Sequence, residues 1–128
     1  MKNLIVSLMF VTLAGFAFAD IGEEVSAALK VGNSKELAKY FASNVELTII
    51  SKEGNYSKAQ AEQILKDFFA SHPVKDFQVM HQGGENGSSR YTIGTLTTSK
   101  AAYRVFYLVK TEGKKQVVSQ LRIENQEE

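Results

Sequence analysis

The sequence predicts an α+β domain in which N-terminal helices pack on a mostly antiparallel sheet. Between residues 20 and 72, apolar side chains recur mainly at the spacing of helices. Between residues 77 and 124 they alternate with polar side chains, as they do along pleated strands. Residues 20–128 contain a single proline and no linker rich in glycine and serine, so one domain is expected.

Two short helices are expected first. Residues 20–30 carry apolar side chains at helical spacing, and Gly32 supplies a stop signal after them. Asn33 followed by Glu36 fits an N-cap with a carboxylate that reaches back towards it. The second helix is therefore expected to begin after Asn33 and to run through Phe41.

A strand, a turn and a longer helix are expected next. Residues 45–50 are rich in β-branched side chains, which favour a strand, and Glu53–Asn55 predicts a turn. Ser57 and Gln60 form a capping box that begins the helix, and Pro73 ends it. The apolar stripe of this helix comprises Ala61, Ile64, Leu65, Phe68 and Phe69.

Four strands complete the predicted fold, and they are Phe77–Gln82, Ser89–Thr98, Ala102–Lys110 and Gln116–Glu124. Successive side chains of a strand point to opposite faces of the sheet, so the alternation sorts these residues into two sets. The set expected to face the core is Phe77, Val79, His81, Tyr91, Ile93, Thr95, Tyr103, Val105, Tyr107, Val109, Val117, Ser119, Leu121 and Ile123.

The first nineteen residues have the pattern of a cleavable export signal. Lys2 precedes an apolar run from Leu4 to Phe18, and the run ends in Ala17-Phe18-Ala19, which fits signal peptidase. The run is shorter than the roughly 20 residues that a membrane-spanning helix needs, so no membrane anchor is expected after cleavage. We therefore expect residues 1–19 to be removed and residues 20–128 to be periplasmic or secreted.

Net charge limits the partners to be expected, and the cysteine count limits the covalent bonds. Of the 15 Lys and Arg residues, only Lys2 lies in the export signal, so the remainder equal the 14 Asp and Glu residues in number. Nucleic acid and anionic membranes attract a concentrated positive charge, so neither is expected as a partner. The chain has no cysteine, which excludes disulfides and a lipid-modified cysteine.

The order of elements resembles the nuclear transport factor 2-like superfamily, a cystatin-like α+β cone in which a curved sheet wraps around helices. Four stretches further resemble a bacterial family of exported proteins of unknown function, and they are Gly32–Phe41, Tyr56–Phe69, His81–Gly83 and Gln120–Glu124. The resemblance implies the fold over residues 20–128. It leaves function open, because this fold hosts isomerases, dehydratases, hydrolases and binding modules.

The resemblance also implies where a pocket would lie. Enzymes of the superfamily work in the mouth of the cone, with a carboxylate base and tyrosine donors on the inner face. Tyr91, Tyr103 and Tyr107 share the predicted inner face with His81, and Tyr40 is expected to approach from the second helix. These residues predict either a polar pocket for a small apolar or amphipathic ligand, or plain core and rim.

Evidence for catalysis or for a bound cofactor is weak. His81 is the only proton-transfer group expected on the inner face, and no carboxylate shares that face with it. Two isolated histidines without cysteine do not predict a metal site. The glycine-rich segment 83–87 joins two strands rather than opening a helix, so it predicts no phosphate cradle, and no cofactor is expected.

The second face of the predicted sheet mixes apolar residues with arginine. Apolar centres bordered by arginine are typical of protein interfaces, and sheet-to-sheet homodimers of the superfamily use this outer face. We therefore expect a homodimer, the alternative being an ordinary exposed sheet with scattered apolar residues. The interface residues expected are Leu96, Arg104, Phe106, Leu108, Val118, Gln120 and Arg122.

The leading functional hypothesis is a non-catalytic binding module for a small molecule or a protein partner. One alternative is a small pocket enzyme that uses His81 and the tyrosines. Another is a structural accessory without a pocket, which an inner cavity filled by Phe68, Phe69 and the tyrosines would favour.

Overall fold

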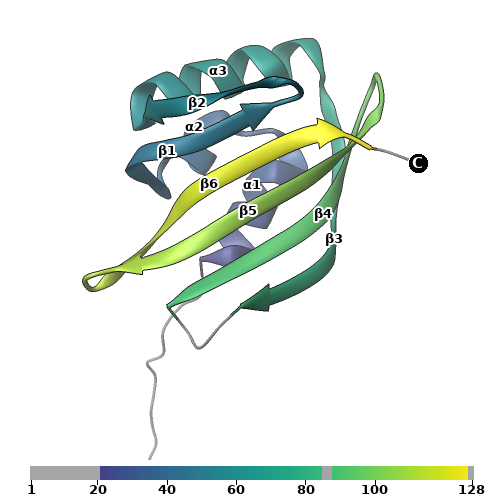
Figure 1. Cartoon of the computed structure of the whole chain (residues 1–128). Helices are drawn as coiled ribbons and strands as arrows, with labels where there is room; N and C mark the ends of the chain where they lie inside the picture. Colours follow the sequence, from purple (N-terminus) through teal and green to yellow (C-terminus); the bar gives the residue numbers. More distant parts are fainter. Residues whose placement is uncertain (1–20, 85–87, 127–128) are drawn as a thin grey trace, which may run out of the picture.

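The α+β fold is confirmed in a computed structural model that describes residues 21–84 and 88–126. Helices lie on one side of a curved sheet, as Figure 1 shows. The predicted export signal falls outside the described residues. In chain order the elements are α1 (Gly22–Val31), α2 (Ser34–Ala38), β1 (Phe41–Ile49), β2 (Lys52–Ser57), α3 (Lys58–Ser71), β3 (Val74–Gly84), β4 (Ser89–Thr98), β5 (Ala102–Glu112) and β6 (Lys115–Asn125).

The end of α1 and the start of α2 are set by local residues, a glycine and a capping asparagine. Gly32 ends α1 in a left-handed conformation, with φ of 65°, which a residue with a side chain adopts only at a cost. The Asn33 side chain accepts a hydrogen bond of 3.0 Å from the amide of Glu36, so the predicted cap of α2 is confirmed. The prediction that this helix reaches Phe41 is wrong, because Phe41 begins β1.

The capping box of α3 is also confirmed. The Gln60 amide donates to the Ser57 hydroxyl oxygen at 3.2 Å, and the Ser57 amide donates to the Gln60 side chain at 3.1 Å. These bonds satisfy two amides that the first turn of a helix leaves without an internal partner. The helix ends at Ser71, just before His72 and Pro73.

The predicted turn at Glu53–Asn55 is wrong, because these residues lie within β2. The chain instead turns at Ile50 and Ser51, and β2 returns antiparallel to β1. Ile50 adopts a φ of 60°, which is costly for a β-branched residue, and its amide donates to the carbonyl of Ile123 at 2.6 Å. The turn is thus fixed by a bond to β6 rather than by a residue with turn preference.

One six-stranded sheet results, with the strand order β2-β1-β6-β5-β4-β3. β1 and β6 are parallel neighbours, and every other neighbouring pair is antiparallel. Helix α1 packs beside β3, whereas α3 packs over the β1–β2 hairpin. The sheet therefore has an inner face covered by helices and an outer face that no described helix covers (Figure 1).

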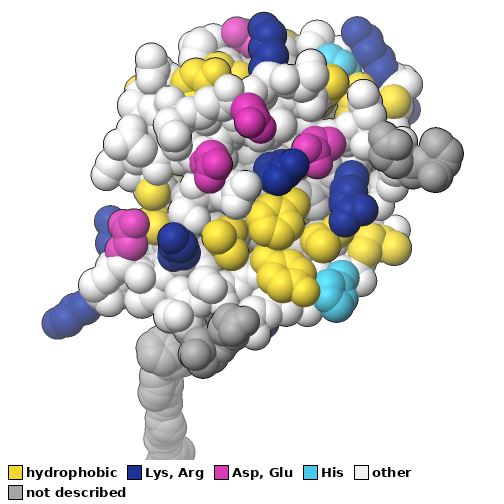
Figure 2. Space-filling view, viewed as in Figure 1, with side chains coloured by type: hydrophobic (Ala, Val, Ile, Leu, Met, Phe, Trp, Pro, Cys, Tyr) yellow, Lys and Arg dark blue, Asp and Glu magenta, His cyan; other side chains and the backbone are white. Residues whose placement is uncertain are grey.

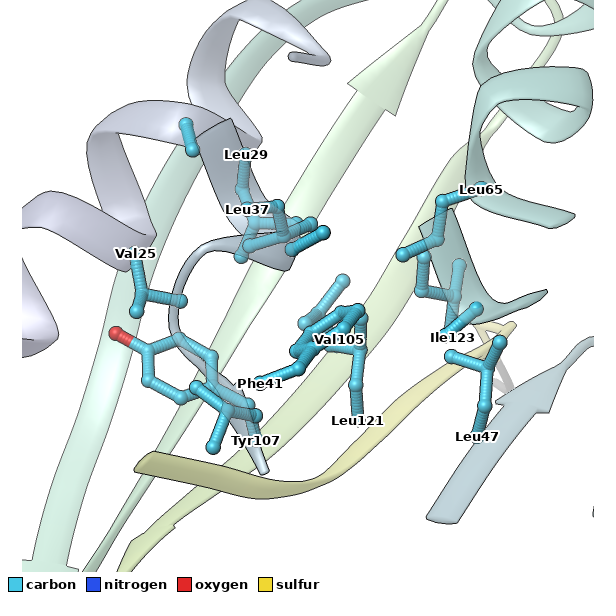
Figure 3. Packing of buried hydrophobic residues seen from close by; sticks show 14 of the residues in the cluster. Val25, Leu29, Leu37, Phe41, Leu47, Leu65, Val105, Tyr107, Leu121 and Ile123 are labelled. Atoms are coloured by element: carbon cyan, nitrogen blue, oxygen red, sulfur yellow. The ribbon is translucent and has the colours of Figure 1, made fainter. Parts of the chain in front are cut away.

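The core lies between the helices and the inner face, and Figure 3 shows its packing. Side chains from α1, α2, α3 and the central strands meet there with almost no exposed surface. Their burial is the main favourable term in folding, at about 25 cal/mol for each Å² of apolar surface removed from water. The largest fully buried members are Tyr107, Phe41, Leu29, Leu37, Leu47, Leu65, Leu96, Leu121 and Ile123.

The predicted division between inner and outer faces holds for β5 and for parts of β3 and β6, but not for β4. β-Bulges shift the alternation of β3 and β6, because Met80 and Ser119 are each an extra residue in the pairing. In β4 the alternation is opposite to the prediction, since Leu96 pairs with Phe77 and Tyr103 on the inner face. Several residues placed on one face by sequence pattern therefore lie on the other.

Candidate functional site

The inner face holds Tyr107 in the middle of the core. Its side chain is fully buried, and its hydroxyl donates to the carbonyl of Gly22 at 2.9 Å. The Ser26 hydroxyl lies 2.9 Å from the same phenol oxygen and can donate to it. Figure 3 shows the hydroxyl pointing toward α1. Tyr107 therefore fastens α1 to the sheet and has no hydroxyl free for a ligand.

Tyr103 closes the other part of the predicted pocket. It is 6% exposed and meets Phe68 edge to face, with ring centroids 5.7 Å apart. Phe68 in turn packs against Phe69 at 5.8 Å and stacks on His72 at 4.2 Å. Tyr40 is partly buried and packs against this core. The inner cavity is thus filled by phenylalanine and tyrosine rings, the arrangement that favours a domain without a deep pocket.

The buried side chains of the described residues include no histidine and no carboxylate. Among residues 21–84 and 88–126, the buried polar residues apart from tyrosine are Thr48, Thr92 and Thr98. Threonine hydroxyls do not ionise near neutral pH, whereas general acid–base catalysis relies on histidine, carboxylates or similar groups. Nothing in the described interior therefore matches the carboxylate-and-tyrosine arrangement of the superfamily's enzymes.

His81 and Tyr91 lie on the outer face, so their assignment to an inner pocket is wrong. The bulge at Met80 turns His81 outward, where its Nε2 lies 3.1 Å from the Tyr91 hydroxyl. The Tyr91 ring stacks on Phe106, with centroids 6.0 Å apart and planes 17° from parallel. We call His81, Tyr91 and Phe106 the aromatic ladder. It crosses β3, β4 and β5 on the side away from the helices.

Apolar and charged side chains surround the aromatic ladder. Ile93 pairs with Phe106 and His81, and Leu108 pairs with Tyr91, so both extend its apolar surface. Figure 2 shows this gathering of apolar side chains on the outer face, bordered by side chains of both charges. Tyr91, Phe106, Ile93 and Leu108 are all half-buried, and an apolar centre with a polar rim is typical of protein interfaces.

An arginine-rich rim adjoins the apolar surface. The Arg122 guanidinium donates to the Glu124 carboxylate at 2.7 Å, and this bond raises the pKa of Arg122 above its ordinary value. Arg104 lies opposite Glu124 in the pairing of β5 with β6. Together with Phe106 these residues line an open hollow of about 560 Å³. The rim therefore carries both charges next to an aromatic centre.

Two of the predicted interface residues do not belong to this surface. Leu96 and Val118 are fully buried in the core, so their placement on the outer face is wrong. Leu96 follows the true alternation of β4, and Val118 faces inward because of the bulge at Ser119. The structure places the other predicted interface residues on the outer face, and they are Arg104, Phe106, Leu108, Gln120 and Arg122.

A second hollow, which the sequence pattern did not predict, lies between α3 and the β1–β2 hairpin. It has a volume of about 380 Å³. It depends on β2, which the pattern had assigned to a turn, so only the apolar stripe of α3 pointed towards it. Its apolar lining comprises Leu47, Ile49, Tyr56, Ile64 and Phe68, and its polar lining comprises Lys52, Asp67 and Ser71.

Neither a metal-binding cluster nor a membrane-spanning helix is found in the described part of the chain. No cluster of three or more metal-binding side chains occurs in residues 21–84 and 88–126. No helix within these ranges is long and apolar enough to span a membrane.

Comparison with known proteins identifies the family. The family model of a domain of unknown function, DUF4783, matches residues 22–124. A DUF4783 family protein from Bacteroides uniformis is 37% identical, with a TM-score of 0.80 over 85% of this chain and 100% of that one. None of the curated proteins matches the chain.

More distant structures share the fold alone. A domain of unknown function with a cystatin-like fold from Nostoc punctiforme is 10% identical, with a TM-score of 0.68 over 84% of this chain and 74% of that one. A hypothetical protein from Catenulispora acidiphila has a ketosteroid isomerase-like fold and was solved in complex with trimethylamine. It is 14% identical, with a TM-score of 0.62 over 84% of this chain and 85% of that one. The chain has a nuclear transport factor 2-like fold and belongs to the DUF4783 family.

Proposed function

We propose that this domain is a non-catalytic binding module that meets a protein partner through the outer face of its sheet. The observation that carries the proposal is the aromatic ladder, which sets Phe106 and Tyr91 beside a rim of arginine and glutamate. Tyrosine and arginine, with tryptophan, are enriched at the energetic centres of interfaces. The export of residues 20–128 after cleavage is part of the same proposal, and it places the partner outside the cytoplasm.

The distribution of polar groups favours binding over catalysis. Enzymes of this fold class would need a proton-transfer group inside the cone, but Tyr107 and Tyr103 occupy that space as core side chains. His81 instead lies exposed on the outer face beside Tyr91. A solvated histidine on an open sheet lacks the enclosure that makes acid–base catalysis effective.

The partner that this surface fits is a second copy of the chain. A two-fold interface brings one patch against the same patch, so it must carry complementary features within itself. The rim includes Arg104 and Arg122 together with Glu124, and residues of both signs can pair across such an axis. A rim of one sign would repel its own copy. Curved sheets packed face to face would bury the aromatic ladder of both copies.

Native mass spectrometry of residues 20–128 at micromolar concentration tests this proposal. The wild type is expected as a dimer, and Phe106→Glu is expected as a monomer, because a buried unpaired charge costs about 3–5 kcal/mol. Ala59→Glu, which adds a charge to an exposed site on α3, is the matched control and should remain dimeric. A monomeric wild type, or a dimeric Phe106→Glu that remains folded, would refute the interface.

The hollow beside α3 supports a second candidate, the binding of a small apolar or amphipathic molecule. Its volume of about 380 Å³ is within the range of ligand pockets, and Tyr56, Ile64 and Phe68 give it an apolar wall. Lys52 and Asp67 stand among its polar residues and would orient a polar end. Native mass spectrometry also tests for this ligand. Wild-type protein purified from its own cell envelope would retain a bound molecule, which would appear as added mass.

A further inference from the structure

β3 is an edge strand with one unpaired side. The sheet order places it last, and within the described residues it pairs only with β4. The strand extends over 11 residues, from Val74 to Gly84. An edge of this length presents backbone N–H and C=O groups that another extended chain can pair with.

Apolar side chains are unusually exposed on this edge. Across residues 21–84 and 88–126, the exposed large hydrophobic side chains are Val31, Val79 and Met80. Val79 and Met80 are adjacent in β3, with exposures of 41% and 63%. Met80 is the extra residue of the bulge, and bulges often occur next to functional sites. The edge thus offers hydrophobic contacts as well as backbone groups.

A groove runs along the inner side of the same edge, between β3 and α1. It has a volume of about 440 Å³. The α1 wall consists of Gly22, Glu23, Ser26, Ala27 and Lys30, and the β3 wall consists of Phe77, Val79 and Gln82. A strand added to β3 would direct every second side chain into this groove, because side chains alternate between faces. The remaining side chains would continue the outer face beyond His81.

The ends of the groove differ in charge. At one end Lys30 pairs with Asp76, with its Nζ 3.2 Å from the carboxylate. Glu23 lies seven residues earlier on α1, about 10 Å along the helix axis. Glu23 and Glu24 are exposed, and neither makes an ion pair within the described residues. A positively charged side chain of a bound segment would therefore find its partner at the Glu23 end.

We propose that the edge of β3, together with this groove, binds an extended peptide segment of another protein. The segment adds to the sheet as a strand, places apolar side chains at alternate positions in the groove, and carries a Lys or Arg that meets Glu23. Main-chain hydrogen bonds supply affinity in this mode of recognition, and the alternate side-chain sites supply selectivity. The site goes beyond the proposed function, because it uses the sheet edge rather than the aromatic ladder.

The sequence of β3 limits what this edge can bind. Pro73 precedes the strand, and register shifts occur between Val74 and Asp76 and again around Met80. Charged residues and bulges at an edge discourage the open-ended pairing that leads to aggregation. The undisturbed runs are therefore short, which suits a peptide of a few residues and disfavours stacking of whole sheets.

Binding of a fluorescein-labelled peptide, Lys-Thr-Val-Thr-Val-Thr-Val-Thr, to residues 20–128 tests the proposal by fluorescence anisotropy. Val79→Lys and Met80→Lys are each expected to weaken binding about tenfold or more, because lysine on an edge opposes strand addition. Val31→Lys is the matched control, since Val31 is 68% exposed and does not line the groove. Equal affinity of all three variants and the wild type would overturn the proposal, as would absence of binding to the wild type.

A second peptide, with alternate backbone amides methylated, tests the mode of binding. It retains the side chains but lacks the donors that pair with an edge, so it is expected not to bind. Binding as tight as that of the unmodified peptide would overturn strand addition. Hydrogen exchange of residues 74–84 is expected to slow on addition of the unmodified peptide. Phe106→Glu leaves this edge unchanged, so retained peptide binding by that variant would separate the present site from the proposed dimer surface.

Discussion

The two faces of β5 use aromatic residues in opposite ways. Tyr103 and Tyr107 point inward, where they are buried against helices. Phe106 lies between them in the sequence but points outward, where it is partly buried and stacks on Tyr91. An aromatic residue therefore indicates function or stability only after its face is known. In this protein the inner rings hold the fold together and the outer rings remain available for contact.

The inner and outer faces of the sheet differ because helices cover the inner face and no described helix covers the outer face. On the inner face, α1 and α3 exclude water from the rings, so each ring contributes its full hydrophobic burial. On the outer face the rings cover one another, and part of their apolar surface remains in water until a partner arrives. Variants matched between the two faces can measure this difference in free energy of unfolding.

The largest contrast is expected between Phe41→Ala and Phe106→Ala. Phe41 is 2% exposed within the core, so its removal leaves a cavity and should lower the free energy of unfolding by about 3–5 kcal/mol. Phe106→Ala should cost only about 1 kcal/mol, since it loses a stacked pair on an open face. Urea denaturation of residues 20–128, in the monomeric state, measures both. Equal losses would contradict the division into a closed and an open face.

Glycine substitutions provide a smaller contrast. A methyl group on Gly94 would lie 2.6 Å from the Phe77 ring and 2.6 Å from the backbone carbonyl oxygen of Gln78, so neither contact can relax easily. Gly94→Ala should therefore destabilise the domain by about 1–3 kcal/mol. A methyl group on Gly83 would meet the hydroxyl end of Tyr91, also at 2.6 Å, and this ring can swing outward.

Gly83→Ala is thus the matched control for Gly94→Ala, and it should cost less. Thermal or urea unfolding measures the two variants under the same conditions. If Gly83→Ala proved the more destabilising, the Tyr91 ring would have to be held as rigidly as the core, and the outer face would not be the adaptable surface described above.

The fold class could be predicted because it depends on regular patterns. Helical spacing identified α1 and α3, and the Ser57–Gln60 capping box located the start of α3 to the residue. These signals act within one or two turns of chain, so they do not depend on tertiary contacts. β2 was not predicted, because its structure depends on a tertiary contact. Its Glu53–Asn55 segment has turn composition, and its pairing with β1 makes it a strand.

The candidate site was harder to predict, because a side chain's face depends on parity. One extra residue at Met80 moves His81 from the inner to the outer face, and no periodic pattern reveals where such a bulge occurs. In β4, the large apolar side chains of Tyr91 and Ile93 predict the wrong inner face, whereas Gly94 lies inside, where the Phe77 ring fills the space above it. Leu96 is the large apolar residue of β4 that does lie on the inner face, and it is buried.

The smallest contrast is expected from removing single hydroxyl groups. Tyr107→Phe would remove the hydrogen bonds of the phenol to the Gly22 carbonyl and the Ser26 hydroxyl beneath α1. A buried hydrogen bond contributes about 0.5–1.5 kcal/mol, and the retained ring prevents any cavity, so a loss of about 1–2 kcal/mol is expected for the two bonds. The local effect should appear as faster hydrogen exchange in α1.

Tyr91→Phe is the control for Tyr107→Phe, because its hydroxyl contacts His81, which is exposed. Water can replace that contact, so a change within about 0.5 kcal/mol is expected. A loss of stability in Tyr91→Phe as large as that in Tyr107→Phe would mean that the His81–Tyr91 contact is structural. The aromatic ladder would then be part of the fold's own stabilisation, and its exposed surface would no longer argue for a partner.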